Sequence, residues 1–217
     1  MTSVRKLIPL VLLGSISLNT NAQVELKNGD LLFNVTNVNE ATDFSRSIVE
    51  STKGVNEAKV NHVAIVCQED SGLFVIEATN KHGVWMCPIE TYLDNADKTE
   101  DGRPMVIVGR VKADVDFAAS IQNAKAYIGK NYDFIFSPTD EEMYCSELVQ
   151  KSYVDKQGKL IFEPIPMSFH DEEGTILPFW FEYYEKRGLD VPEGEPGSNP
   201  GALSRDKNVE IIDTVEH

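Results

Sequence analysis

The stretch Val60–Thr79 reads VNHVAIVCQEDSGLFVIEAT and contains two runs of β-branched and apolar residues. The turn-forming run Glu69–Gly72 separates them, which predicts an antiparallel β-hairpin. With the turn centred between positions 70 and 71, the numbers of directly opposed residues add to 141, so His62 and Glu77 share one face of the hairpin. They become diagonal neighbours, roughly 7–8 Å apart between backbone positions and within reach of long side chains.

His62 and Glu77 are residue types that suit acid–base chemistry. Histidine is the usual base for a cysteine nucleophile. A carboxylate within the apolar run FVIEA needs a partner if it is buried, and a neighbouring imidazole would serve. Glu77 would then fix the tautomer of His62 and stabilise its charged form. A shift of the register by one residue would put the two side chains on opposite faces.

The candidate nucleophile is Cys145, in the run SPTDEEMYCSELVQKSYV at residues 137–154. Residues at helical spacing follow it, so the cysteine stands at the start of a helix that the acidic run DEE is expected to cap. The positive end of the helix macrodipole and the free backbone N–H groups favour the thiolate, the form that attacks carbonyls. The nearby Glu141, Glu142 and Glu147 oppose the thiolate, and a charged histidine must outweigh them.

A cysteine at a helix start is by itself usually inert, and a histidine at a strand end is usually an ordinary polar residue. Cys145, His62 and Glu77 lie on elements that can converge, so together they predict a Cys-His-Glu triad. The other histidines lie in a turn, in a loop rich in proline and acidic residues, and at the chain end; they are His82, His170 and His217.

Two further cysteines, Cys67 and Cys87, allow two interpretations. An oxidising compartment permits a disulfide between them. Alternatively, both are small apolar residues of strands. The sequence has no CxxC motif and no spaced set of histidines and cysteines, so it predicts no metal site and no cofactor.

Periodicity and turn residues predict the remaining elements. Strands are expected at 31–33, 83–87 and 105–111, and helices within 39–58, at 89–93 and at 114–129. The last helix is expected to be capped by Asp114, to bury Phe117, Ile121, Ala124 and Ile128, and to end at Gly129. Residues 132–136 are expected to form a strand or an extended loop. Beyond residue 158, abundant Pro, Gly and aromatic residues predict a long wrap over the sheet.

Residues 1–22 are typical of a secretory signal peptide, with a basic pair, a short apolar run and small residues before a cut near Ala22. The apolar run is shorter than the roughly 20 residues that a membrane span requires. We therefore expect an exported, periplasmic protein whose single domain covers 23–217, without stable membrane insertion. The formal net charge of −15 disfavours nucleic acid and anionic membranes as partners.

The order of these motifs resembles a known family. The strand histidine in NHVAIV, the strand glutamate in FVIEAT and the helix cysteine in YCSELV are similar to the circularly permuted branch of the NlpC-type papain-like amidases, the YiiX-like group. The C-terminal run VPEGEPGSNPGALSRDKNVEI is also similar to this group. The resemblance implies an α+β, circularly permuted papain-like fold, with an antiparallel sheet packed against helices and the nucleophile at a helix N-terminus. It further implies Cys145 as nucleophile, His62 as base and Glu77 as its orienter.

The residues expected to bind substrate are Tyr144, Tyr132 and Asn61. Tyr144 stands where such proteins often have an aromatic residue, and its hydroxyl or the backbone N–H of Cys145 would donate to an oxyanion. Tyr132 and Trp85 are candidates for lining a groove, with core packing the favoured role for Trp85.

The expected function is that of a cysteine amidase or peptidase acting on cell-wall peptides, peptidoglycan fragments or other small peptides. Two alternatives stay open. A lipid acyl hydrolase or acyltransferase of the same fold would need an apolar groove, for which Phe179-Trp180-Phe181 is the candidate unless it packs in the core. A non-catalytic ligand-binding relative would keep the scaffold alone. The sequence does not fix the oligomeric state.

Overall fold

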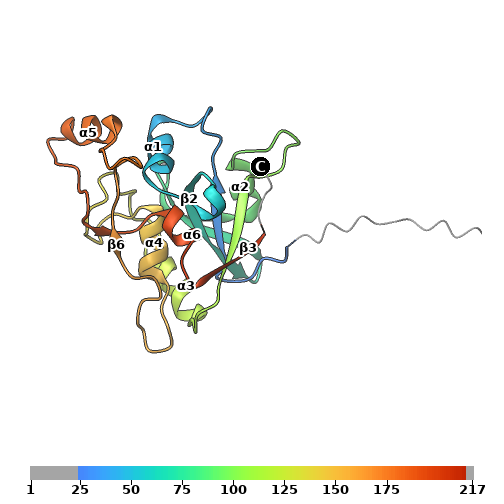
Figure 1. Cartoon of the computed structure of the whole chain (residues 1–217). Helices are drawn as coiled ribbons and strands as arrows, with labels where there is room; N and C mark the ends of the chain where they lie inside the picture. Colours follow the sequence, from blue (N-terminus) through green and yellow to red (C-terminus); the bar gives the residue numbers. More distant parts are fainter. Residues whose placement is uncertain (1–23, 214–217) are drawn as a thin grey trace, which may run out of the picture.

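A six-stranded antiparallel sheet forms the centre of the computed structural model, which describes residues 24–213 (Figure 1). The order across the sheet is β4-β3-β2-β1-β5-β8. Its strands are β1 (Leu31–Val35), β2 (Val60–Glu69), β3 (Gly72–Thr79), β4 (Gly83–Pro88), β5 (Val106–Val111) and β8 (Val209–Asp213). A separate pair joins β6 (Ile165–Pro166) to β7 (Pro196–Gly197). The predicted α+β class with an antiparallel sheet is confirmed.

Helices surround this sheet. They are α1 (Asp43–Ser51), α2 (Ile89–Asn95), α3 (Phe117–Ala126), α4 (Cys145–Ser152), α5 (Pro178–Glu185) and α6 (Pro200–Ser204), with a short 3₁₀ turn at Val55–Glu57. Helix α4 packs on β2 and β3, α6 packs on β2, and α2 packs on β3 and β4. Helices α1 and α5 contact each other and lie together at one end of the molecule (Figure 1). None of the described helices has the length and apolar character needed to cross a membrane.

The hairpin of β2 and β3 has the predicted register. Ile65 pairs with Ile76 and Val66 with Val75, as a turn centred between positions 70 and 71 requires. Because β2 begins near the end at which β3 finishes, His62 and Glu77 lie at the same end of the sheet.

The sheet is buried on both faces, which explains why β2 is an almost continuous apolar run. One apolar cluster includes Ile65 of β2 and Leu148 of α4. The opposite cluster includes Val66 of β2 and Tyr92 of α2. Cys67 belongs to the first cluster and Cys87 to the second, and both thiols are free and buried. The two cysteines are therefore apolar strand residues, and their positions on opposite faces exclude a disulfide in this fold.

The start of α3 differs from the prediction. Asp116, not Asp114, caps the helix, and its carboxylate accepts the N–H of Ala119 at 3.0 Å. Asp114 instead forms an ion pair with Lys156. The backbone N–H of Asp116 bonds to the carbonyl of Val154 at 2.9 Å, so the chain is held extended up to the cap and the helix begins only after it.

The end of α3 also falls short of the prediction. The helix ends at Ala126, and Ile128, expected to be buried, is 42% exposed. Gly129 has φ of 93° and donates its N–H to the carbonyl of Val84. The chain therefore leaves the helix to meet β4, which turns Ile128 towards solvent.

The N-cap of α4 also differs from the prediction. Tyr144 is the N-cap residue, and the acidic run at 140–142 lies in the preceding loop. The carboxylate of Glu147 accepts the N–H of Tyr144 at 3.4 Å, so the capping acid comes from within the first helical turn. Residues 132–136, expected to form a strand or an extended loop, form a loop, in which the carboxylate of Asp133 accepts the backbone N–H groups of residues 135 and 137.

The segment after residue 158 is more regular than the sequence suggests. It contributes α5, α6, the β6–β7 pair and the edge strand β8, which pairs with β5. Single aromatic and proline-rich stretches lack a clear period, so these elements were not predicted. The signal peptide predicted at 1–22 lies outside the described residues.

Candidate active site

Cys145 occupies the first position of α4 and is 5% exposed. The helix is buried on almost every side, with Leu148 and Val149 fully inaccessible. A first-turn residue lies beside backbone N–H groups that have no partner within the helix. The macrodipole adds positive potential at the same place, so negative charge on the Cys145 sulfur or on a bound oxygen is favoured there.

A chain of polar contacts runs from His62 through Glu77 to Trp85. Nε2 of His62 lies 2.6 Å from Oε2 of Glu77, and the indole Nε1 of Trp85 donates to Oε1 of Glu77 at 3.0 Å. Glu77 pairs directly with Trp85 in the register of β3 and β4. The buried carboxylate therefore has a partner on each oxygen, as a low-dielectric site requires.

The ionisation of His62 is set by opposing effects. Burial of the ring lowers its pKa, but hydrogen bonding and charge from Cys145 and from Glu77 outweigh burial and raise the pKa of His62 to about 10. Since Nε2 is engaged by Glu77, Nδ1 is the ring nitrogen that remains for Cys145. Burial raises the pKa of Glu77, but His62 and then Trp85 outweigh it and lower that pKa. The imidazole is therefore held in its charged form at neutral pH, beside the cysteine.

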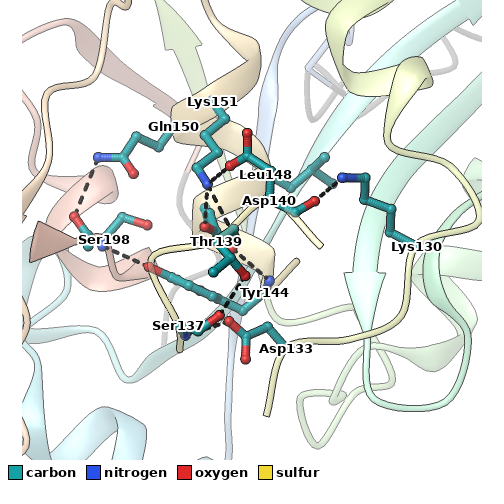
Figure 2. A network of polar contacts seen from close by, with 12 residues as sticks. Lys130, Asp133, Ser137, Thr139, Asp140, Tyr144, Leu148, Gln150, Lys151 and Ser198 are labelled. Atoms are coloured by element: carbon teal, nitrogen blue, oxygen red, sulfur yellow. Dashed lines mark hydrogen bonds and ion pairs between the residues drawn. The ribbon is translucent and has the colours of Figure 1, made fainter. Parts of the chain in front are cut away.

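The acidic residues near Cys145 are largely compensated. The Glu147 side chain is 4% exposed and lies 2.7 Å from Nζ of Lys151. Lys151 also pairs with Asp140 on the preceding loop (Figure 2). Burial raises the pKa of Glu147 to about 7, although Lys151 lowers it. Glu141 is exposed to solvent, so the opposing charge that the sequence predicts near the sulfur is weakened by pairing and by water.

The predicted substrate-binding residues come together with Cys145. Asn61, Tyr132 and Tyr144 line one cavity with it, of about 480 Å³ including its open mouth. Apolar side chains form most of the wall, and they are Ile48, Phe136, Met167, Phe169, Trp180 and Pro200. We call this space the acyl cavity. Among the residues that the structure describes, no His, Asp, Glu, Lys or Arg belongs to its lining.

A second cavity, of about 990 Å³ including open space, adjoins the first. It is lined by His62, Glu77 and Trp85, with further polar side chains from Asn34, Thr42, Asn80, Lys81, His82 and Asn95. We call it the polar cavity. Ile48, Asn61 and Tyr132 line both cavities, so the site is a single groove with an apolar part at the cysteine and a polar part at the histidine.

The tyrosines have different environments. The hydroxyl of Tyr144 accepts the backbone N–H of Ser198 at 3.1 Å (Figure 2). This contact directs the hydroxyl to the segment between β7 and α6. Tyr144 therefore contributes its aromatic ring to the cavity wall. Burial, followed by the charge of Cys145, raises the pKa of Tyr132.

The other histidines take different positions. His82 stacks on the indole of Trp85, with ring centroids 4.1 Å apart. His170 contacts the carbonyl of Asp171 and lies 3.5 Å from Glu193, away from the groove. His217 lies outside the described residues.

The aromatic cluster at 179–181 is divided. Trp180 is 2% exposed and lines the acyl cavity, Phe179 packs beside it, and Phe181 is 59% exposed. The cluster thus combines packing with a contribution to the cavity wall.

Sequence reasoning missed the hydrogen bond from Trp85 to Glu77 and the serines of the acyl cavity. Extending the parity argument from β3 to β4 would have placed Trp85 opposite Glu77. Ser146 and Ser198 carried no signal, because serine is common at helix starts and in loops.

A cysteine at a helix start, with a histidine and a glutamate on antiparallel strands that precede it in sequence, defines the permuted papain-like class of fold. The chain belongs to the family described as permuted papain-like amidase enzymes of the YaeF/YiiX, C92 type, which it matches over residues 25–212.

Known relatives agree with this assignment. The chain is 26% identical over 180 residues to the uncharacterized protein YiiX of Escherichia coli strain K12. The aligned region covers 82% of this chain and 81% of that protein. A crystal structure of YiiX from Escherichia coli O157:H7 has the same fold, with a TM-score of 0.68 and 24% identity over 87% of this chain and 97% of that one.

The crystallised YiiX is described as a metalloprotein. Within residues 24–213 of this chain, no three His, Cys, Asp or Glu side chains form a group that could hold a metal ion. The described residues therefore do not provide the donor set of a typical metal site.

Proposed function

We propose that this protein is a cysteine hydrolase that cleaves amide bonds through Cys145, His62 and Glu77. One observation carries the proposal: Cys145 begins a buried helix and interacts with a histidine whose other ring nitrogen lies 2.6 Å from a buried carboxylate. A cysteine, a base and an orienting group in this order are what nucleophilic catalysis on a carbonyl requires.

In the first step the Cys145 thiolate attacks the substrate carbonyl, and the C=O π electrons move to the oxygen. The backbone N–H of Cys145, at the positive end of α4, donates to the developing oxyanion. The imidazolium of His62 then gives its proton to the amine nitrogen, the C–N bond breaks, and a thioester remains on Cys145.

In the second step neutral His62 takes a proton from water, and the oxygen of that water attacks the thioester. Collapse of the intermediate releases the acid and restores the thiolate beside the imidazolium. Glu77 keeps Nδ1 of His62 directed at the sulfur through both steps, and Trp85 keeps Glu77 in place.

The substrates that we propose are small peptides, including cell-wall peptides and peptidoglycan fragments. The groove supports this class, because two cavities adjoin at the reacting groups and share Ile48, Asn61 and Tyr132 as lining residues. We further propose that residues 1–22 direct export to the periplasm, where such substrates occur.

A second candidate function is hydrolysis or transfer of lipid acyl chains. The apolar wall of the acyl cavity, which includes Trp180 and Phe169, favours it. A ligand-binding role without chemistry would use the same groove.

The decisive experiment incubates the wild type and Cys145→Ala with muropeptides and with phospholipids and follows the products by mass spectrometry. We expect loss of peptide cleavage in Cys145→Ala. Cleavage of phospholipids alone would favour the acyl-lipid function, and identical product patterns for the two proteins would favour simple binding.

Alkylation tests the activation of the thiol independently. At neutral pH iodoacetamide should label Cys145 faster than a model thiol, and His62→Ala should abolish the advantage. Cys67 and Cys87 are internal controls, since both are buried in the sheet and should stay unlabelled in the folded protein. Labelling of Cys145 at the rate of a model thiol would contradict the proposal.

A further inference from the structure

Three buried polar atoms have no hydrogen-bond partner among the described residues, and all three belong to residues that line the acyl cavity. They are Oδ1 of Asn61, Oγ of Ser146 and Oγ of Ser198. Ser146 is 1% exposed and Ser198 is 8% exposed. Buried polar groups are almost always paired with protein or with a bound molecule, so three unpaired atoms on residues of one cavity wall indicate that water or a ligand completes their hydrogen bonds there.

The surrounding contacts hold these atoms in place. Nδ2 of Asn61 donates to Oγ of Ser45 at 2.6 Å, which leaves Oδ1 as a free acceptor. The backbone N–H of Ser198 is bound to the Tyr144 hydroxyl (Figure 2). Ser146 is fixed in the first turn of α4. The three atoms come from β2, α4 and the segment before α6, so three independent parts of the fold each contribute one unpaired, buried polar atom from a residue of the cavity wall.

Their chemistry selects a neutral ligand. An amide oxygen accepts from an N–H group, and a serine hydroxyl both donates and accepts. No charged side chain within residues 24–213 lines the cavity, so a buried ammonium or carboxylate would lose its hydration without gaining a counter-charge from these residues. An amide has one N–H donor and one carbonyl acceptor, and it matches this set without carrying charge.

The positions of the two cavities indicate which part of the substrate each one binds. Cys145 lines the acyl cavity and not the polar one, whereas His62 lines the polar cavity and not the acyl one. The sulfur retains the acyl part of the substrate, and the histidine protonates the departing amine. The acyl part therefore enters the apolar cavity, and the amine enters the polar one.

We infer that the acyl cavity recognises an N-acylated aminoacyl residue with an apolar side chain. The apolar wall takes the side chain, while Asn61, Ser146 and Ser198 bind the neutral amide that precedes it. This inference rests on the proposed function and names the substrate class for the same site. A free amino terminus or a plain fatty acyl chain would leave the three polar atoms unpaired or place a charge among apolar groups.

The test compares three anilides that share one side-chain size: N-acetyl-leucine, leucine with a free amine, and 4-methylpentanoic acid. We expect the acetylated compound to be cleaved with a kcat/KM at least about tenfold above the other two, because rejecting a ligand that cannot satisfy buried polar groups is a strong source of specificity. Asn61→Leu and a Ser146→Ala/Ser198→Ala double variant should reduce this preference to about twofold or less. Ser168→Ala is the matched control for the preference, since its hydroxyl in the same wall is already bound to the Ser51 carbonyl.

A binding measurement makes the test independent of catalysis. Calorimetry on Cys145→Ala should show tighter binding of N-acetyl-leucinamide than of leucinamide or 4-methylpentanamide, again by about tenfold. Equal binding of the three amides, or tighter binding of the plain acyl amide, would overturn the inference. Equal cleavage of the three anilides by the wild type would also overturn it, while the hydrolase function would stand. If N-acetyl-leucinamide binds most tightly but no cleavage depends on Cys145, the proposed hydrolase function would be rejected. The inferred ligand specificity of the cavity would then still stand.

Discussion

The indole N–H of Trp85 donates to Oε1 of Glu77 at 3.0 Å, on the side of the carboxylate away from His62. The two residues are direct partners in the register of β3 and β4. A carboxylate held at both oxygens has one orientation, so His62 is positioned from the sheet rather than by a loop. His82 covers the outer face of the indole by stacking.

Trp85→Phe should therefore lower kcat about tenfold and leave KM nearly unchanged. The substitution keeps an aromatic, though smaller, ring and removes the donor to a buried carboxylate, an interaction of roughly 1.5–3 kcal/mol when the acceptor is charged. Steady-state kinetics on the best amide substrate measures the effect. His82→Ala is the control, because it removes the stacked ring and keeps the hydrogen bond. A rise in KM with unchanged kcat would contradict the positioning role.

Glu77→Gln should move the alkaline limb of the pH profile. In the wild type the proton on His62 is lost around its raised pKa of about 10, so kcat/KM should fall only at high pH. Glutamine keeps a similar shape but removes the negative charge, which lowers the pKa of His62. We expect the alkaline limb to shift to lower pH and the plateau to fall by about 10- to 100-fold. An unchanged alkaline limb would show that Glu77 does not act through the imidazole.

Glu147 should make the free energy of unfolding depend on pH. Burial raises its pKa from 4.5 to about 7 in the folded protein, so the native state binds more protons than the unfolded state between these values. Its contribution is fully present below pH 4.5 and is lost as the pH rises through about 7. Urea unfolding of the wild type and Glu147→Gln between pH 4.5 and 8 measures this difference.

The expected result is a weaker loss of stability with rising pH in Glu147→Gln over that window, because glutamine does not ionise. Glu182→Gln is the control, since its ion pair with Lys186 is on the exposed surface. Identical pH slopes for the wild type and Glu147→Gln would contradict the shifted ionisation.

Gly83→Ala should destabilise the protein by on the order of 3 kcal/mol or more. Gly83 has φ of 64°, and an added Cβ would lie 2.1 Å from the backbone carbonyl of Lys130, which cannot move independently. This close approach joins β4 to the segment that carries Tyr132. Gly158→Ala is the control, with φ of 79° and open space, and should cost only the left-handed strain of about 1–2 kcal/mol. Thermal or urea unfolding of the two variants should separate them; similar losses would contradict the close contact.

Local residue patterns were enough to predict the hairpin at 60–79 and the approach of Glu77 to His62. Side chains alternate along a strand with a period of two, and the turn at positions 70 and 71 fixes the register, so the approach of Glu77 to His62 follows from short-range geometry. The start of a helix at Cys145 was also predicted from neighbouring residues alone. These three positions and their order along the chain, together with the C-terminal run, carry the resemblance to the permuted papain-like family, and the family match over residues 25–212 confirms it.

The helix caps show where local reasoning fails. Asp114 and Asp116 are both acceptable caps in the sequence, and the backbone hydrogen bond from Asp116 to Val154 selects the second. The run at 140–142 is acidic, but Lys151 pairs with Asp140 on that loop (Figure 2). Lys151 also pairs with Glu147, and Glu147 provides the cap.

The shape and polarity of the groove, in contrast, depend on long-range packing. The walls of the acyl cavity come from α1, β2, the loop at 132–136, α4, the segment at 167–169, α5 and the start of α6 with the residues before it. These parts are far apart in sequence, and no periodic pattern links them. Whether the hydroxyls of Ser146 and Ser198 are paired depends on which atoms lie within about 3 Å once the chain has closed. That distance is a property of long-range packing, whereas the pairing of His62 with Glu77 needed only a short turn between two strands.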